Sequence, residues 1–179
     1  LILNDYHQTI EESSPKIDLL QPTGGTNPYF AQFGWTGESG LDVPTSDTVW
    51  SADSQELDVG KPVTLSWTND AGVRFEQVIS LDQNFMFTVD QRVINNSGDT
   101  ISATPYDDLP DEPGMKESFP TTGGWMGITD KYWLVALIPD QNNSVTGTFR
   151  QTGTADPQYH VNYIMTPQAI APGDTMEQT

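Results

Sequence analysis

Apolar and polar residues alternate with a period of two along much of the chain, which is typical of strands that bury one face. Val63–Asn69, for example, places Leu65 and Trp67 on one face and threonine and serine on the other. We predict further strands of this kind at Pro28–Trp35, Val73–Leu81, Phe85–Ile94, Ser144–Gln151 and Gln158–Met165. No stretch sustains an apolar period of 3.6 residues over three turns, so the pattern predicts no helix.

One further strand has apolar residues on both faces. Tyr132–Ile138 is apolar throughout, so we predict a central strand among the most buried segments of the fold. Asn69–Gly72 lies between two alternating strands and predicts a hairpin turn in which Gly72 takes the left-handed conformation. These elements predict an all-β fold with two packed antiparallel sheets, a β-sandwich.

The length of 179 residues suits one domain, so we predict a single domain over residues 1–179. Ser102–Pro120 contains four prolines, few aliphatic residues and the acidic side chains Asp107, Asp108, Asp111, Glu112 and Glu117. This composition predicts an exposed acidic loop over about 102–120. The chain begins at Leu1, inside a strand-like segment, and we therefore expect a fragment of a longer protein.

The formal net charge is −18, from 25 acidic and 7 basic residues. The basic residues are isolated from one another along the chain and therefore build no cationic stripe. Without clustered basic residues the chain cannot neutralise the phosphates of nucleic acid or the headgroups of anionic lipid, so we expect no nucleic-acid partner.

Candidate catalytic and metal-binding residues are few. The chain has no cysteine, and its two histidines are His7, after a strand end, and His160, on the polar face of a predicted strand. We interpret both histidines as surface residues. The acidic residues at 107–112 lack the spacing of a calcium loop, and no serine lies in a nucleophile elbow. We therefore predict no catalytic residues, no metal site, no cofactor and no enzyme activity.

Large aromatic residues leave two interpretations open. Tyr29, Trp35, Trp50 and Trp125 lie in segments flanked by glycine and proline, near predicted strand ends. They either fill the core of the sandwich or line an apolar cleft that takes an extended polypeptide.

Three segments carry a family resemblance. Gly123–Trp133 (GGWMGITDKYW), running on to Ala136–Pro139, resembles the signature of the large periplasmic domain of the YidC membrane protein insertase family. Asn27–Trp35 and the turn Ala171–Gly173 resemble other parts of the same domain. That family has more chain between Thr104 and Asp107 than is present here.

The resemblance implies a β-supersandwich with a galactose-mutarotase-like fold. It implies a multi-pass parent protein in the inner membrane of a Gram-negative bacterium, which inserts and folds membrane proteins, with this domain on the periplasmic side. The implied partners are nascent membrane proteins and the Sec components SecDF and SecYEG. A carbohydrate-binding or mutarotase-like domain and a purely structural spacer remain alternatives, since a shared fold does not carry function.

Overall fold

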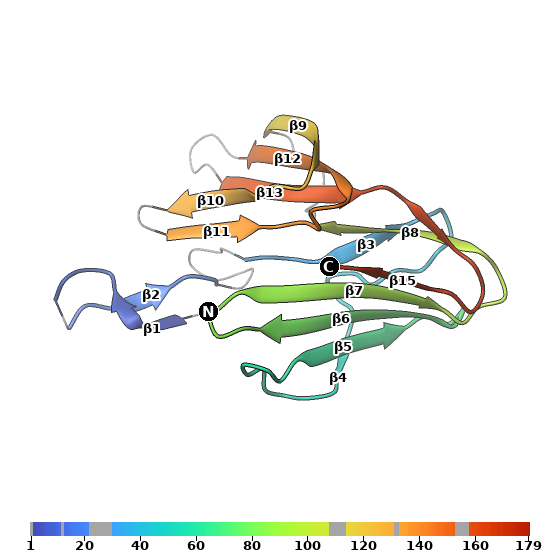
Figure 1. The fold of residues 1–179 in the computed structure, drawn as a ribbon, viewed down its shortest axis with the longest axis horizontal. Helices are drawn as coiled ribbons and strands as arrows, with labels where there is room; N and C mark the ends of the chain where they lie inside the picture. The colour runs from blue at the N-terminus through green and yellow to red at the C-terminus, as the bar shows by residue number, and fades with distance from the viewer. Residues whose placement is uncertain (1, 12, 22–29, 108–113, 131–132, 153–157) are drawn as a thin grey trace. The chain divides into compact units, whose positions relative to one another are not determined.

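A computed structural model describes residues 2–11, 13–21, 30–107, 114–130, 133–152 and 158–179 (Figure 1). Every regular element in these residues is a β-strand, which confirms the predicted all-β class. Contacts within the chain define two compact units. The larger comprises Phe33–Ile128 with Ala136–Thr179, and the smaller comprises Leu1–Gln32 with Thr129–Val135. The single domain over residues 1–179 stays a prediction.

One sheet of the larger unit has five antiparallel strands, which Figure 1 shows side by side. Their spatial order is β15 (Thr175–Gln178), β7 (Phe87–Asn95), β6 (Val73–Leu81), β5 (Val63–Thr68) and β4 (Ser51–Ala52). β6 has the predicted bounds, and β5 and β7 differ from theirs by one or two residues at an end. The predicted turn between β5 and β6 is confirmed, because Gly72 has a φ of 90° and the Asn69 amide donates to the Val73 carbonyl over 3.0 Å.

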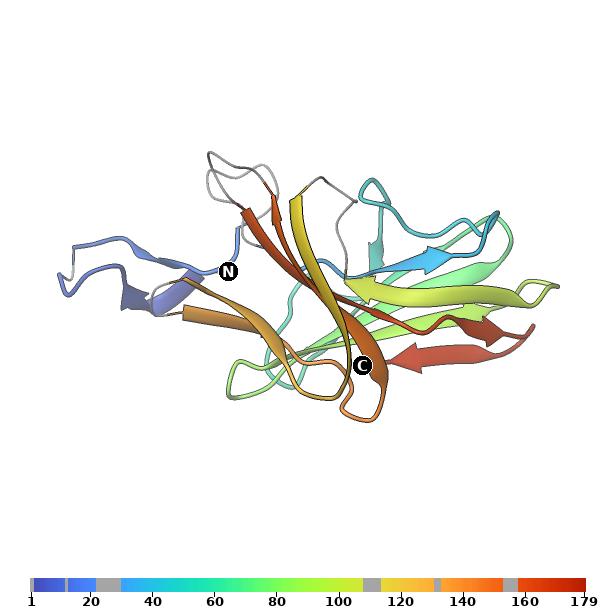
Figure 2. The same cartoon turned by 90° about the horizontal axis from the view of Figure 1, so that it is seen from above.

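The second sheet has six strands, of which β12, β13 and β9 run together in Figure 2. The order is β14 (Gln168–Ile170), β8 (Ile101–Asp107), β13 (Gln158–Met165), β12 (Ser144–Thr152) and β9 (Gly114–Thr122), and β3 (Gly34–Gly37) also pairs with β8. Both predicted strands are present, with β13 at its predicted bounds and β12 one residue longer, but their burial does not follow the predicted faces: Phe149 and Tyr159 are exposed, whereas Arg150 is buried. Of the strand predicted at Pro28–Trp35, the described part from residue 30 is a strand only from Gly34, where β3 begins.

The main hydrophobic core joins these two sheets. The six-stranded sheet contributes Trp35 from β3, Ile101 and Ala103 from β8, and Ile170 from β14. The five-stranded sheet contributes its buried residues Val73, Phe75, Val93 and Met176. The two-sheet β-sandwich is therefore confirmed, while its galactose-mutarotase-like character stays a prediction.

Buried amide side chains add polar ties between the sheets. Gln91 of β7 donates through Nε2 to the Gly34 carbonyl over 2.8 Å, and Gln77 of β6 donates to the Phe33 carbonyl over 2.9 Å. Asn95, at the end of β7, is fully buried and donates to the Ile170 carbonyl over 2.9 Å. These bonds satisfy carbonyl groups that would otherwise be costly to bury, and they fix how the sheets meet.

A second, smaller core lies against β12 and β13 of the six-stranded sheet. It contains the buried residues Met126, Val145, Tyr163 and Met165, with Leu137 and Val161 packed against them. Met126 belongs to β10 (Met126–Asp130) and Leu137 to β11 (Trp133–Leu137), which pair with each other in a separate two-stranded sheet.

The prediction of a buried central strand at Tyr132–Ile138 is wrong in its burial. β11 is a strand, but Leu134 is 49% exposed and Ile138 is also exposed. Among the described strands β11 has one neighbour, β10, instead of the two that a central strand has, and Tyr132 lies outside the described residues. An apolar sequence therefore did not guarantee a cover over both faces.

The predicted acidic loop over 102–120 is wrong at both ends, where β8 and β9 lie. Pro105, in the middle of β8, is fully buried. It stands where β8 changes neighbour, from β14 at Ile101–Ala103 to β13 at Tyr106 and Asp107, so its missing amide hydrogen removes little from the ladder. β9 is the last strand of its sheet, a position that accepts Pro120.

The first segment of the smaller unit contains a short strand pair. β1 (Ile2–His7) pairs with β2 (Lys16–Asp18), with an irregular register between Leu3 and His7. Tyr6 meets Trp133 edge to face, with ring centroids 5.2 Å apart. Such an edge-to-face pair adds stability beyond the area that it buries.

Added salt is expected to stabilise this chain. In the described residues, ion pairs join Lys61 to Asp58, Arg74 to Glu76 and Arg92 to Glu177, and each has at least one exposed partner, so each contributes little. The net charge of −18 therefore acts mainly as self-repulsion. Screening over about 10 Å at 0.1 M salt should raise the melting temperature. Thermal melts at low and moderate NaCl measure this, and a falling melting temperature would show that the ion pairs outweigh the repulsion.

Candidate functional site

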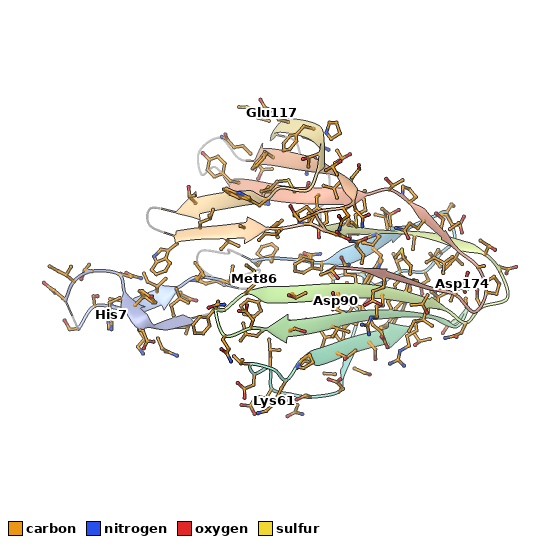
Figure 3. The ribbon with its side chains drawn as sticks, viewed as in Figure 1. His7, Lys61, Met86, Asp90, Glu117 and Asp174 are labelled. Carbon is orange, nitrogen blue, oxygen red and sulfur yellow. The ribbon has the colours of Figure 1, made fainter. Side chains whose placement is uncertain are left out.

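The outer edge of the six-stranded sheet is exposed. β9 is the terminal strand and pairs with β12, and no described strand pairs with its other edge. Every side chain described along β9, from Met115 to Thr122, is exposed or half-buried. Figure 3 shows Glu117 on this strand. An edge strand offers unpaired amide and carbonyl groups, so β9 can accept a further strand.

Apolar side chains gather on one face beside this edge. Phe119 of β9 and Phe149 of β12 stack with ring centroids 5.9 Å apart and planes 22° apart, yet they are 37% and 39% exposed. The register places Met115 and Tyr159 on the same face, because both lie opposite Gln151. We call Met115, Phe119, Phe149 and Tyr159 the β9 patch.

The β9 patch continues the smaller core without a break. Gly147 lies opposite Phe119 on β9 and Tyr163 on β13, and Tyr163 belongs to that core. A Cβ on Gly147 would lie 2.5 Å from the Met126 sulfur and 3.2 Å from the Phe119 ring, so only glycine allows this approach. Met126 thus covers the face as far as Gly147, and the aromatic residues beyond it stay open.

The charge around the β9 patch selects among ligands. Glu117 lies opposite Phe149 and between Met115 and Phe119 on the same face, and the whole chain carries −18. A negative field disfavours anionic ligands. The arrangement therefore suits an apolar or basic extended polypeptide, whose backbone pairs with the edge while alternate side chains reach the aromatic rings.

Two of the four residues predicted to line a cleft, Trp35 and Trp50, contact each other, but they do so in the main core. Trp35 is 1% exposed and packs against Phe75 and Trp50, at centroid distances of 5.2 and 6.1 Å, so it fills the main core. Trp50 is partly buried against the same core. Trp125 is 63% exposed, after two glycines of which Gly124 is held by Gln141. Tyr29 lies outside the described residues, and the cleft of these four residues stays a prediction.

The β9 patch was partly visible in the sequence. Ser144–Gln151 alternates in a way that puts Val145 and Phe149 on one face. Phe119, however, lies 30 positions earlier, in a segment whose acids and prolines predicted a loop. Only the pairing of β9 with β12 brings its ring onto Phe149.

The histidines build no recognisable catalytic arrangement. His7 is exposed, and its Nδ1 lies 2.7 Å from the Ser14 carbonyl oxygen. His160 is half-buried on β13, with Nε2 3.3 Å from the Thr152 hydroxyl. Among the described residues, no three histidine or carboxylate side chains gather closely enough to hold a metal ion. The absence of catalysis, metal and cofactor stays a prediction.

Comparison with known proteins decides the family. The YidC periplasmic domain family matches residues 1–120 and 106–179, which together cover the chain. This chain belongs to that family. The YidC periplasmic domain lies on the periplasmic side of the inner membrane, which confirms the predicted localisation. Among the described residues, none forms a helix that is long and apolar enough to span a membrane.

Individual YidC relatives agree with this assignment. The chain is similar to the membrane protein insertase YidC of Acidiphilium cryptum, with 37% identity over all of this chain and 38% of the relative. It is also similar to those of Granulibacter bethesdensis (39% identity, 85% of this chain, 33% of the relative) and Brucella suis (35%, 99% and 35%). The chain thus spans about a third of the length of these relatives.

The alignments also show where this chain is shorter. The alignment with the Acidiphilium cryptum protein runs over 231 positions and covers all 179 residues, so that relative carries residues that this chain lacks. The two family matches overlap at residues 106–120, which include the last two residues of β8 and most of β9.

Proposed function

We propose that this chain serves a YidC-type insertase as an accessory module that contacts extended polypeptide through the edge of β9. The polypeptide is either a nascent membrane protein or a segment of a Sec component such as SecDF or SecYEG. The observation that carries the proposal is the edge of β9 that no described strand pairs with, beside the exposed, stacked rings of Phe119 and Phe149.

The chemistry of the β9 patch supports binding rather than catalysis. Exposed aromatic side chains offer large contact areas at low entropic cost, and sheet edges recognise backbone groups without regard to sequence. An accessory domain that meets many partners needs this tolerance. We accordingly expect no sugar mutarotation, and turnover by the chain that is lost in His160→Ala would contradict this expectation.

A single backbone amide can test the edge. Pro120 has no amide hydrogen, and a proline in a sheet normally points its nitrogen away from the partner strand. Amides two residues apart face the same way, so we infer that the Ser118 amide faces the open edge of β9. Ser118→Pro would remove that donor and leave the ladder with β12 intact.

The direct experiment titrates the chain with a short synthetic peptide that alternates valine and lysine. We expect amide chemical shifts to change along β9, and Ser118→Pro and Phe149→Ser each to weaken binding by about tenfold. Ser118→Ala is the matched control, because it removes the hydroxyl contact with Thr148 but keeps the amide. Thermal melts establish that each variant is folded.

Two results would overturn the proposal. Flat chemical shifts up to millimolar peptide would leave the structural spacer as the better description. Undiminished affinity in both Ser118→Pro and Phe149→Ser would show that the peptide binds elsewhere, and Trp125 would then be the next surface to examine.

A further inference from the structure

The turn between β6 and β7 holds three consecutive apolar side chains in the solvent. Phe85 is 78% exposed, and Met86 and Phe87 are also exposed. We call these three residues the aromatic tip. Figure 3 shows Met86 at one end of the five-stranded sheet and Asp174 at the other. The turn that contains Gly173 and Asp174 lies at the other end of β7, because the Gly173 amide donates to the carbonyl of Asn95, the last residue of that strand.

Asp82 gives the turn a defined shape. Its Oδ1 accepts the Asn84 amide over 2.7 Å and the Met86 amide over 2.9 Å, and its own amide donates to the Met86 carbonyl over 3.1 Å. The Met86 amide, followed by the Asn84 amide, lowers the pKa of the Asp82 carboxyl. The aromatic tip is therefore built on an ordered turn.

Phe85 has a backbone conformation that phenylalanine disfavours. Its φ is 62°, in the left-handed region, and it is the one non-glycine residue of the described chain with a positive φ. Glycine, asparagine or aspartate would occupy this position with less strain. An exposed phenylalanine here gains little from burial, so packing within the described chain does not offset the strain of its backbone.

We propose that the aromatic tip inserts into the interfacial region of the lipid bilayer. The family assignment places the chain on the periplasmic side of the inner membrane, where a bilayer surface is close. Aromatic side chains favour that interface, and a convex tip of three consecutive residues can enter lipid without a matching pocket. A protein partner would have to supply such a pocket.

Local charge permits this insertion. Residues 82–87 contain one ionisable group, Asp82, and its carboxylate is turned toward the backbone amides of the turn. Lys61 is close to this turn, because the amide of the preceding residue, Gly60, donates to the Leu81 carbonyl. The Lys61 ammonium is paired with the Asp58 carboxylate at 2.8 Å. The contact is thus apolar, and the charge of −18 makes it weaker on anionic lipid.

The absence of cysteine allows a site-specific test. Met86→Cys carries an environment-sensitive NBD fluorophore on the aromatic tip, and Ala171→Cys carries it at the other end of β7 as the matched control. A hexahistidine tag after Thr179 holds each protein on phosphatidylcholine vesicles through a nickel-chelating lipid, which makes a weak contact measurable. We expect a blue shift and a brighter signal at position 86 and neither at position 171.

Phe85→Asn provides the variant arm, because asparagine tolerates a positive φ but removes the ring. In this variant the signal at position 86 should fall to that of the control, and untagged protein should partition into vesicles about tenfold less. Phe85→Gly should keep or raise the melting temperature, since glycine relieves the backbone strain. Replacing phosphatidylcholine with phosphatidylglycerol should weaken insertion at low salt.

Three outcomes would overturn the inference. An unchanged spectrum at position 86 on vesicles excludes insertion. A blue shift that survives Phe85→Asn excludes the ring as its cause, and a lower melting temperature in Phe85→Gly assigns the ring to folding. A shift that needs added protein in place of lipid would identify a protein pocket. None of these results bears on the β9 edge, so this inference and the proposed function fail separately.

Discussion

Trp35→Ala is expected to lower the free energy of unfolding by about 3–5 kcal/mol, the largest loss among the substitutions considered. Trp35 is the largest fully buried side chain and touches Trp50 and Phe75, so alanine leaves a cavity at the centre of the main core. Urea unfolding followed by circular dichroism measures the change.

Trp35→Phe is the matched control for this cavity. It keeps an aromatic ring and removes an indole N–H that has no hydrogen-bond partner among the described residues. The expected loss is about 1–2 kcal/mol, because a smaller cavity is partly offset by the removal of an unsatisfied donor. A loss below about 1 kcal/mol in Trp35→Ala would contradict the core position of this residue and reopen its assignment to a cleft.

Asn95→Ala should lower the free energy of unfolding by about 3 kcal/mol. Its Nδ2 donates to the carbonyls of Ile170 and Asp99, and its Oδ1 accepts the amide and hydroxyl of Ser97. Alanine would leave the buried Ile170 carbonyl without this donor. Because that bond joins β7 to β14, hydrogen exchange should accelerate first in β14 and β15.

Ser97→Ala separates the contributions to this network. It removes the hydroxyl contacts with Asn95 and Asp99 but leaves both Nδ2 bonds, so we expect a loss below about 1 kcal/mol. Equal losses in Asn95→Ala and Ser97→Ala would show that the local turn, and not the link to β14, carries the stability.

Alternation of side chains predicted strands well where one face of the strand meets the core. β6 has the predicted bounds, since Val73 and Phe75 alternate with polar residues, and β13 has them although the exposed Ile164 stands between Tyr163 and Met165. It failed at β11, because apolar character on two faces does not reveal how many neighbours a strand has. β8 and β9 were missed because proline was taken as a strand breaker, although Pro105 and Pro120 occupy positions that need no amide donor.

The surfaces proposed for function were harder to predict than the fold. Phe119 and Phe149 meet through a pairing across 30 residues of sequence, and such registers follow from the whole sheet. Phe85 was taken as the start of a strand, since no pattern of apolar residues reports a positive φ. Of the aromatic residues proposed from the sequence to line a cleft, Trp35 is buried in the core and Trp125 is exposed, because a side chain suited to a cleft is equally suited to a core.

The five methionines differ in burial, so an oxidant would reach some of them before others. Met126, Met165 and Met176 are enclosed in the two cores, whereas Met86 lies on the aromatic tip and Met115 on the β9 patch. Oxidation converts an accessible thioether into a polar sulfoxide. Since the chain also lacks cysteine, peroxide would modify both proposed contact surfaces before it reached the core, and the folded protein would outlast its ability to bind.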